Sequence, residues 1–178
     1  ELQFKELIAT HSTSGVEITF EILFGSTFTN ILEVIEKKSF DLIILGSHGA
    51  AGLRELFIGS NAEKIVRFSP VPVIVVKNYL NKPIKNIVFP NSLETEGQED
   101  LVMKVKAMQD FFQAHLHIVW INTITGFTND TITHERLNAF AKRFMLSNYS
   151  LHIFNDINQE EGIRAFNKLV NGDLIAMA

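Results

Sequence analysis

The stretch GSHGAAGLRELFIGSNAEK, residues 46–64, decides how the rest of the chain is interpreted. It follows the apolar run DLIIL (41–45), which is typical of a buried parallel strand. It carries four of the chain's ten glycines within fourteen residues and then turns helical, with Ser60 and Glu63 spaced as a capping box. A loop between a buried strand and a helix is where doubly wound α/β proteins bind ligands.

The physical properties of this loop suit a phosphate group. Glycines let the backbone approach a ligand closely, and a helix N-terminus offers free N–H groups and a favourable dipole. The pattern is not a Walker A loop, because no lysine follows the last glycine, and it is neither G-x-G-x-x-G nor G-x-S-x-G. Two interpretations stay open: a phosphate cradle, or a structural turn in which Ser60 only caps the helix.

Strand-like and helix-like segments alternate outward from the loop. Residues 1–12 resemble the end of a helix, and stretches with helical apolar spacing separate the later strand-like runs. This βαβ alternation predicts an α/β fold with a mostly parallel, doubly wound sheet. The predicted strands are VEITFEILFG (16–25), DLIIL (41–45), VPVIVV (71–76), IKNIVFP (84–90), HLHIVWI (115–121), YSLHIF (149–154) and DLIAMA (173–178).

An internal repeat predicts two related domains. The sequence of strand, helix and DLIIL recurs as strand, helix and DLIAM, with Asp41 and Asp173 in matching positions. We expect residues 1–77 to be the C-terminal part of a first domain, 78–83 a linker, and 84–178 a second domain without its C-terminal part. The chain is therefore expected to belong to a longer tandem protein, with an upstream segment completing the first sheet.

The loop also carries a family resemblance. Its pattern is G-x-x-G, nine residues, then G-S, and it resembles the nucleotide-binding signature of the universal stress protein family. The segments NAEKIVRFSPVPVIVV and IKNIVFPNSLE are similar to that family's last helix and strand and to its first strand and loop. The resemblance implies a Rossmann-like, five-stranded parallel sheet of order 3-2-1-4-5 in each domain, with helices on both faces.

The resemblance also implies a ligand and a role. The expected ligand is ATP, with AMP or another adenine nucleotide as alternatives and Mg²⁺ accompanying ATP. The protein is expected to act in stress response or regulation without clear catalytic turnover, and no catalytic residues are predicted. In the second domain, Asn91 follows Pro90 where ATP-binding relatives commonly have Asp. The predicted nucleotide-binding residues are Gly46, Ser47, His48, Gly49, Gly59, Ser60 and Asn61.

Two other functions remain open at this point. The first is a dimerisation or interaction module on the same fold that binds no nucleotide, since Ala50 and Ala51 stand where relatives often place a basic residue. The second is a slow ATPase. The resemblance implies a homodimer, or an intramolecular pair of domains, joined through the last strand VPVIVV (71–76).

The composition also limits the classes of partner and of binding site that we expect. The net charge is −4 without a Lys/Arg cluster, so no nucleic-acid partner is expected. Because cysteine is absent, disulfides and Cys-based zinc sites are excluded. Without a membrane-length apolar run or a signal peptide, we expect a cytoplasmic protein that does not interact with membranes. His115 and His117 share one strand face, and His152 could approach them, but no third ligand follows at a recognisable spacing, so no metal site is predicted.

Overall fold

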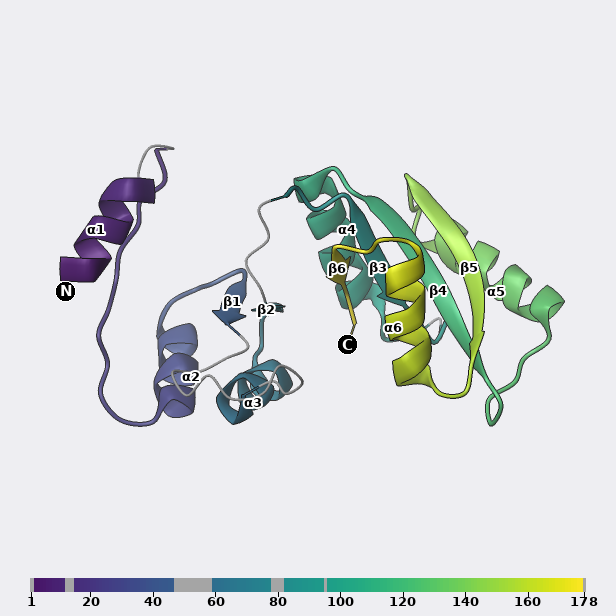
Figure 1. Cartoon of the computed structure of the whole chain (residues 1–178), viewed down its shortest axis with the longest axis horizontal. Coiled ribbons are helices and arrows are strands. Elements are labelled where there is room, and N and C mark those ends of the chain that lie inside the picture. Colours follow the sequence, from purple (N-terminus) through teal and green to yellow (C-terminus); the bar gives the residue numbers. More distant parts are fainter. Residues whose placement is uncertain (1, 12–14, 47–58, 78–81, 95, 178) are drawn as a thin grey trace. The chain divides into compact units, whose positions relative to one another are not determined.

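The computed structural model describes residues 2–11, 15–46, 59–77, 82–94 and 96–177. The chain divides into two compact units, Glu1–Tyr79 and Leu80–Ala178, and each is described by itself (Figure 1). Most of the predicted linker, residues 78–81, lies outside the described residues. None of the helices in the described ranges is long and apolar enough to cross a membrane.

The described residues of the first unit form a pair of parallel strands and three helices. Strands β1 and β2 pair in parallel, with Ile43 opposite Val73 and Gly46 opposite Val76. Helix α3 contacts both α2 and β2, and its Ile65 is buried. The helix expected near the N-terminus and the strands expected at 41–45 and 71–76 are confirmed. The elements are α1 (Leu2–His11), α2 (Thr27–Lys37), β1 (Ile43–Gly46), α3 (Ser60–Phe68) and β2 (Val73–Val76).

The prediction of a strand over residues 16–25 is wrong. This segment forms no strand in the described structure, although its residue types favour one. A strand is stabilised by the hydrogen bonds of a neighbouring strand, and β1 and β2 pair with each other rather than with this segment. The ring of Phe20 stacks instead on that of Phe4, with the ring centroids 5.3 Å apart, whereas Phe24 is 92% exposed.

The second unit is a four-stranded parallel sheet with helices on both faces. The strands lie in the order β5-β4-β3-β6 and all pair in parallel. Counted along this unit, that order is 3-2-1-4, which agrees with the predicted order and confirms the doubly wound α/β fold. The elements are β3 (Asn86–Pro90), α4 (Glu99–Phe112), β4 (His115–Thr123), α5 (Asp130–Arg143), β5 (Tyr149–Asp156), α6 (Gln159–Leu169) and β6 (Leu174–Ile175).

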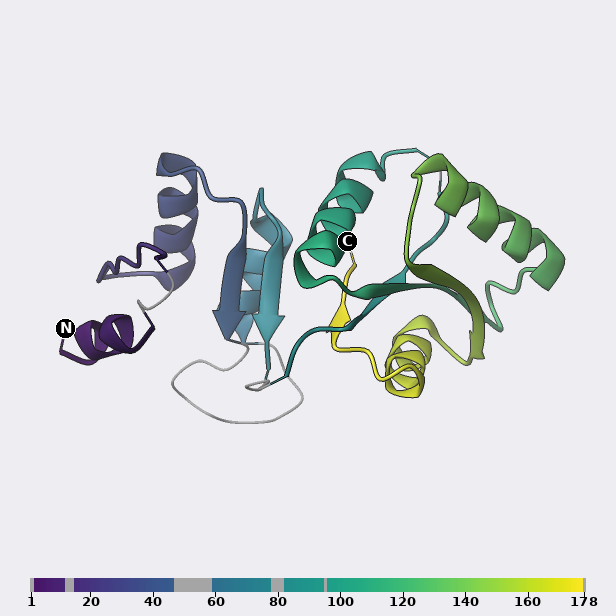
Figure 2. The same ribbon diagram turned by 90° about the horizontal axis from the view of Figure 1, so that it is seen from above.

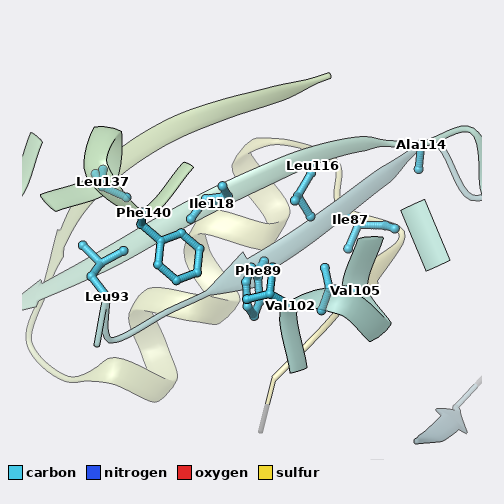
Figure 3. Packing of buried hydrophobic residues seen from close by; sticks show 10 residues of the cluster. All are labelled: Ile87, Phe89, Leu93, Val102, Val105, Ala114, Leu116, Ile118, Leu137 and Phe140. Carbon is cyan, nitrogen blue, oxygen red and sulfur yellow. The ribbon is translucent and has the colours of Figure 1, made fainter. Parts of the chain in front are cut away.

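Helices α4 and α5 lie on one face of this sheet and α6 lies on the other (Figure 2). Because successive side chains of a strand point to opposite faces, each strand contributes to two cores. The larger core packs Ile87, Phe89, Leu116 and Ile118 against α4 and α5 (Figure 3). The smaller core, under α6, consists of Val88, Val119, Ile121 and Phe166. Because all four strands are parallel, their carboxyl ends lie at the same edge of this sheet.

Candidate functional site

The predicted nucleotide loop begins and ends in described structure. Gly46 is the last residue of β1. Gly59 directly precedes α3, whose first two residues are Ser60 and Asn61. The segment between them, residues 47–58, lies outside the described residues, and with it three of the predicted binding residues: Ser47, His48 and Gly49.

The helix after the loop begins one residue earlier than the capping box predicts. Gly59 is the N-cap, with φ −58° and ψ 144°, and as a glycine it has no side chain with which to cap the helix. The N–H of Glu63 donates to the carbonyl of Gly59 at 3.0 Å, so Ser60 is already helical. The predicted capping box is therefore wrong, because the Ser60 hydroxyl would have to lie one position before the helix to accept from the Glu63 N–H.

This helix start offers backbone donors rather than charged side chains. The first N–H groups of a helix have no carbonyl partner within the helix, and Gly59 supplies no side-chain acceptor for them. The first turn contains one charged residue, Glu63, whose carboxylate does not attract phosphate. An anion at this end of α3 would therefore be held by N–H groups, by the helix dipole and by the hydroxyl of Ser60.

In the second unit, the end of β3 forms a turn of its own. The Oδ1 of Asn91 accepts from the N–H of Leu93 at 2.7 Å, and its Nδ2 donates to Oε1 of Gln98 at 2.6 Å. The N–H of Asn91 donates to the carbonyl of Val119 at 3.1 Å. The side-chain amide of Asn91 is thus engaged in holding the loop after β3.

A cavity of about 780 Å³ at the carboxyl ends of β4 and β5 was not predicted from the sequence. Its charged lining groups are the carboxylates of Asp130 and Asp156, so it does not suit a phosphate. The sequence feature that could have indicated this cavity is the change from apolar to polar residues where both strands end. The lining residues are Asn122, Thr123, Ile124, Phe127, Asn129, Asp130, Thr131, Asn155, Asp156 and Ile157.

Comparison with known sequences finds a family that resembles the first part of the chain. Residues 1–77 match the sequence model of the universal stress protein family. Through these residues the chain is similar to members of that family. It is 43% identical over 63 residues to universal stress protein MJ0531 of Methanocaldococcus jannaschii, a match that covers 35% of this chain and 37% of the relative. It is 36% identical over 63 residues to universal stress protein MJ0577 of the same organism, covering 35% and 39%.

Solved universal stress proteins share the fold across nearly the whole chain. A universal stress protein from Archaeoglobus fulgidus superposes with a TM-score of 0.71 at 17% identity, covering 97% of this chain and 62% of the other. A putative universal stress protein from Pseudomonas aeruginosa gives 0.72 at 14% identity, covering 98% and 65%. At these identities the likeness concerns the fold. The chain spans less than two thirds of both structures and of the curated relatives that it matches.

The second unit also brings together histidines that are distant in sequence. Nδ1 of His117 on β4 lies 3.2 Å from Nε2 of His152 on β5. The ring of His115 lies 4.7 Å from that of His117, centroid to centroid. Burial, and to a smaller extent the neighbouring histidines, hold the pKa values of His117 and His152 below the ordinary value. No group of three or more acidic or histidine side chains in the described ranges is arranged to hold a metal ion.

Proposed function

We propose that the chain binds an adenine nucleotide, with ATP as the first candidate, and acts in stress response or regulation without clear catalytic turnover. The observation that carries this proposal is the arrangement of β1 and α3, in which Gly46 ends the strand and Gly59 and Ser60 begin the helix. The match of residues 1–77 to the universal stress protein family supports the same ligand class. Mg²⁺ would accompany ATP.

The proposed phosphate contacts are those of a helix start. The N–H groups of Ser60 and Asn61 and the Ser60 hydroxyl would donate to phosphate oxygens, and Gly59 would let the phosphate approach the backbone. Gly46 would bring the carboxyl end of β1 close to the ribose. The proposed contacts also include Ser47, His48 and Gly49.

Titration with ATP tests this site in the full chain. Ser60→Ala should weaken binding about tenfold or more, because a hydrogen bond to a charged group contributes about 1.5–3 kcal/mol. Gly59→Val should weaken it at least about tenfold, because φ −58° and ψ 144° suit valine and the added methyl groups would meet the phosphate. Isothermal titration calorimetry measures both constants.

The matched control is Ser26→Ala at the start of α2. Ser26 caps that helix by accepting from the N–H of Thr29 at 3.4 Å, so its loss should lower stability by about 1 kcal/mol. ATP affinity should stay unchanged in this variant. If Ser60→Ala and Gly59→Val bind ATP as the unmodified chain does, the proposed phosphate site is wrong.

We also propose that β2 joins two domains or two copies of the chain. Among the described residues β2 pairs on one side only, with β1, so its other edge offers unpaired N–H and C=O groups. The four side chains of Val73–Val76 are apolar, and Val76 is 39% exposed. Sedimentation equilibrium should show dimers of the chain, and a chain that stays monomeric at high concentration would contradict the pairing of two copies through β2.

A further inference from the structure

We propose that His117 and His152 form a zinc-binding pair on the α6 face of the second unit. The sequence alone predicts no metal site, because no third ligand follows His115 and His117 at a recognisable spacing. The sheet places Val119 opposite His152 and so brings the two rings together across β4 and β5. The inference does not depend on nucleotide binding.

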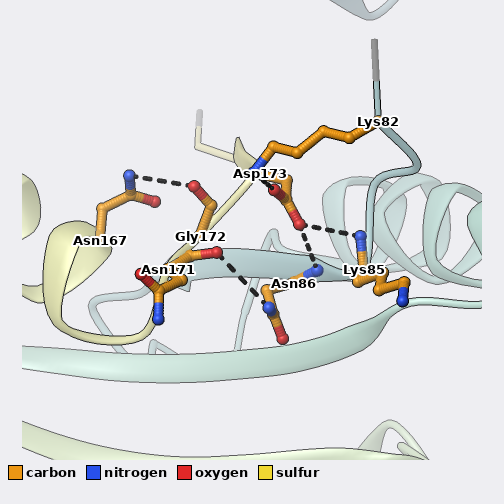
Figure 4. A network of polar contacts seen from close by, with 7 residues as sticks. All are labelled: Lys82, Lys85, Asn86, Asn167, Asn171, Gly172 and Asp173. Carbon is orange, nitrogen blue, oxygen red and sulfur yellow. Dashed lines mark hydrogen bonds and ion pairs between the residues drawn. The ribbon is translucent and has the colours of Figure 1, made fainter. Parts of the chain in front are cut away.

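The hydrogen bonds of this face fix which nitrogen of each ring carries the proton. Nδ2 of Asn86 donates to the carbonyl of Asn171 at 3.4 Å, which leaves Oδ1 of Asn86 as an acceptor (Figure 4). That oxygen lies 3.3 Å from Nε2 of His117, so Nε2 is the protonated nitrogen and Nδ1 carries the lone pair. Nδ1 of His117 then accepts from Nε2–H of His152.

This arrangement is the one that metal-binding histidines need. A ligating imidazole usually donates its other N–H to a carbonyl or carboxylate oxygen, which orients the ring, and Asn86 supplies that oxygen to His117. Tetrahedral zinc with Zn–N bonds of about 2.0–2.1 Å places two nitrogens about 3.3–3.4 Å apart. The observed 3.2 Å between His117 and His152 is close to that spacing.

Zinc would replace the proton between the two rings. His152 would lose the proton from Nε2 and take one on Nδ1 from solvent, so both rings stay neutral and each presents one lone pair to the metal. The ring of Phe166 lies 4.9 Å from that of His152 and covers this side of the pair with an apolar group. Water would fill the remaining positions on zinc, since the described residues contain no group of three ligands.

His115 provides the matched control because both of its nitrogens are already engaged. Its Nδ1 lies 2.9 Å from Oδ1 of Asn148, whose Nδ2 donates to the carbonyl of Ala114, so Nδ1 of His115 is the donor. Its Nε2 accepts from the hydroxyl of Ser150 at 2.8 Å. His115 lies on the same strand face as His117 but keeps no free lone pair for a metal.

Zinc titration of the full, chelator-stripped chain tests the pair. His117→Gln and His152→Gln should each lower zinc affinity about tenfold or more, and the double variant should lose little beyond either single one. His115→Gln should stay within about threefold of the unmodified chain. Equal zinc affinity in the unmodified chain and in both His117→Gln and His152→Gln would overturn the proposal, as would absence of binding at about 1 mM zinc.

Nitrogen-15 NMR of the histidine rings gives a second test that needs no variant. Without metal, His117 and His152 should both show the Nε2–H tautomer. Zinc should convert His152 to the Nδ1–H tautomer and shift the resonances of His117 Nδ1 and His152 Nε2. If zinc binds while the tautomer of His152 stays unchanged, the metal lies elsewhere and the proposal is wrong.

Discussion

Phe140→Ala should lower the free energy of unfolding of the second unit by about 3–5 kcal/mol. Phe140 on α5 is 1% exposed, and its ring lies 6.3 Å from that of Phe89 and 4.8 Å from that of Phe144. Removing it deletes the apolar burial and leaves a cavity between α5 and the sheet, which rigid neighbours fill only in part. A domain of this size has about 5–15 kcal/mol in total, so much of its stability would be lost.

Urea unfolding followed by tryptophan fluorescence measures this loss in the second unit alone. Trp120 is the chain's single tryptophan, and it lies on β4 against the same core. The control is Phe111→Ala on α4, the same chemical change at a side chain that is 79% exposed, which should alter stability by no more than about 0.5 kcal/mol. Similar losses in the two variants would contradict the assignment of Phe140 to the core.

The strands of the second unit were predictable because strands that are buried on both faces of a sheet contain continuous apolar runs. IKNIVFP and HLHIVWI each contain a continuous apolar run, IVFP and IVWI, and in the structure β3 and β4 are covered by helices on both sides. The sheet order came from the family resemblance, because alternation of strands and helices alone does not say which strand lies beside which. The parallel pairing of β3 with both β4 and β6 agrees with it.

The two errors concern a segment that has no partner strand and the exact residue at which a helix begins. Residues 16–25 have strand-forming side chains, but no strand forms without a partner in the described structure. The capping box failed because Gly59, although it has no side-chain acceptor, adopts the extended N-cap conformation and moves the helix start by one residue. The sequence correctly predicted that the glycine loop lies between a strand and a helix. Nucleotide binding by this loop is a proposal.

The two aspartates of the internal repeat differ in their exposure and contacts. Asp41 and Asp173 match in sequence, and each stands just before the apolar residues of a short parallel strand. Asp41 is exposed, whereas the side chain of Asp173 is 5% exposed and fully engaged. Spacing predicts equivalent positions, but the partners of the Asp173 carboxylate, Lys82, Lys85 and Asn86, lie far from it along the chain and had to be found in the structure.

Asp173→Asn should destabilise the second unit by about 2–4 kcal/mol near pH 7. Oδ2 of Asp173 accepts from the N–H groups of Lys85 at 2.9 Å and Asn86 at 3.0 Å, and Oδ1 lies 2.5 Å from Nζ of Lys82 (Figure 4). These contacts tie the start of β3 to the residue before β6. The amide of asparagine keeps the shape, but it removes the charge and replaces one acceptor oxygen with a donor.

The size of this effect should depend on pH in a defined direction. Burial raises the pKa of Asp173, but the Lys82 ammonium and the N–H groups of Lys85 and Asn86 outweigh it, so its pKa lies below the ordinary 3.8. A carboxyl group with a lowered folded-state pKa stabilises the fold above its unfolded pKa and loses that contribution as the pH falls through the folded value. The difference between the unmodified chain and Asp173→Asn should therefore shrink below about pH 4.

Urea unfolding at about pH 7 and pH 3, followed through Trp120, measures that difference. Asp100→Asn is the control, because Asp100 is 81% exposed and pairs with Lys104 one helical turn away, a contact that contributes about 0.3–0.5 kcal/mol. A loss in Asp173→Asn that stays constant between the two pH values would show that shape rather than charge matters at this position. A loss as small as that of Asp100→Asn would show that Asp173 does not hold β3 and β6 together.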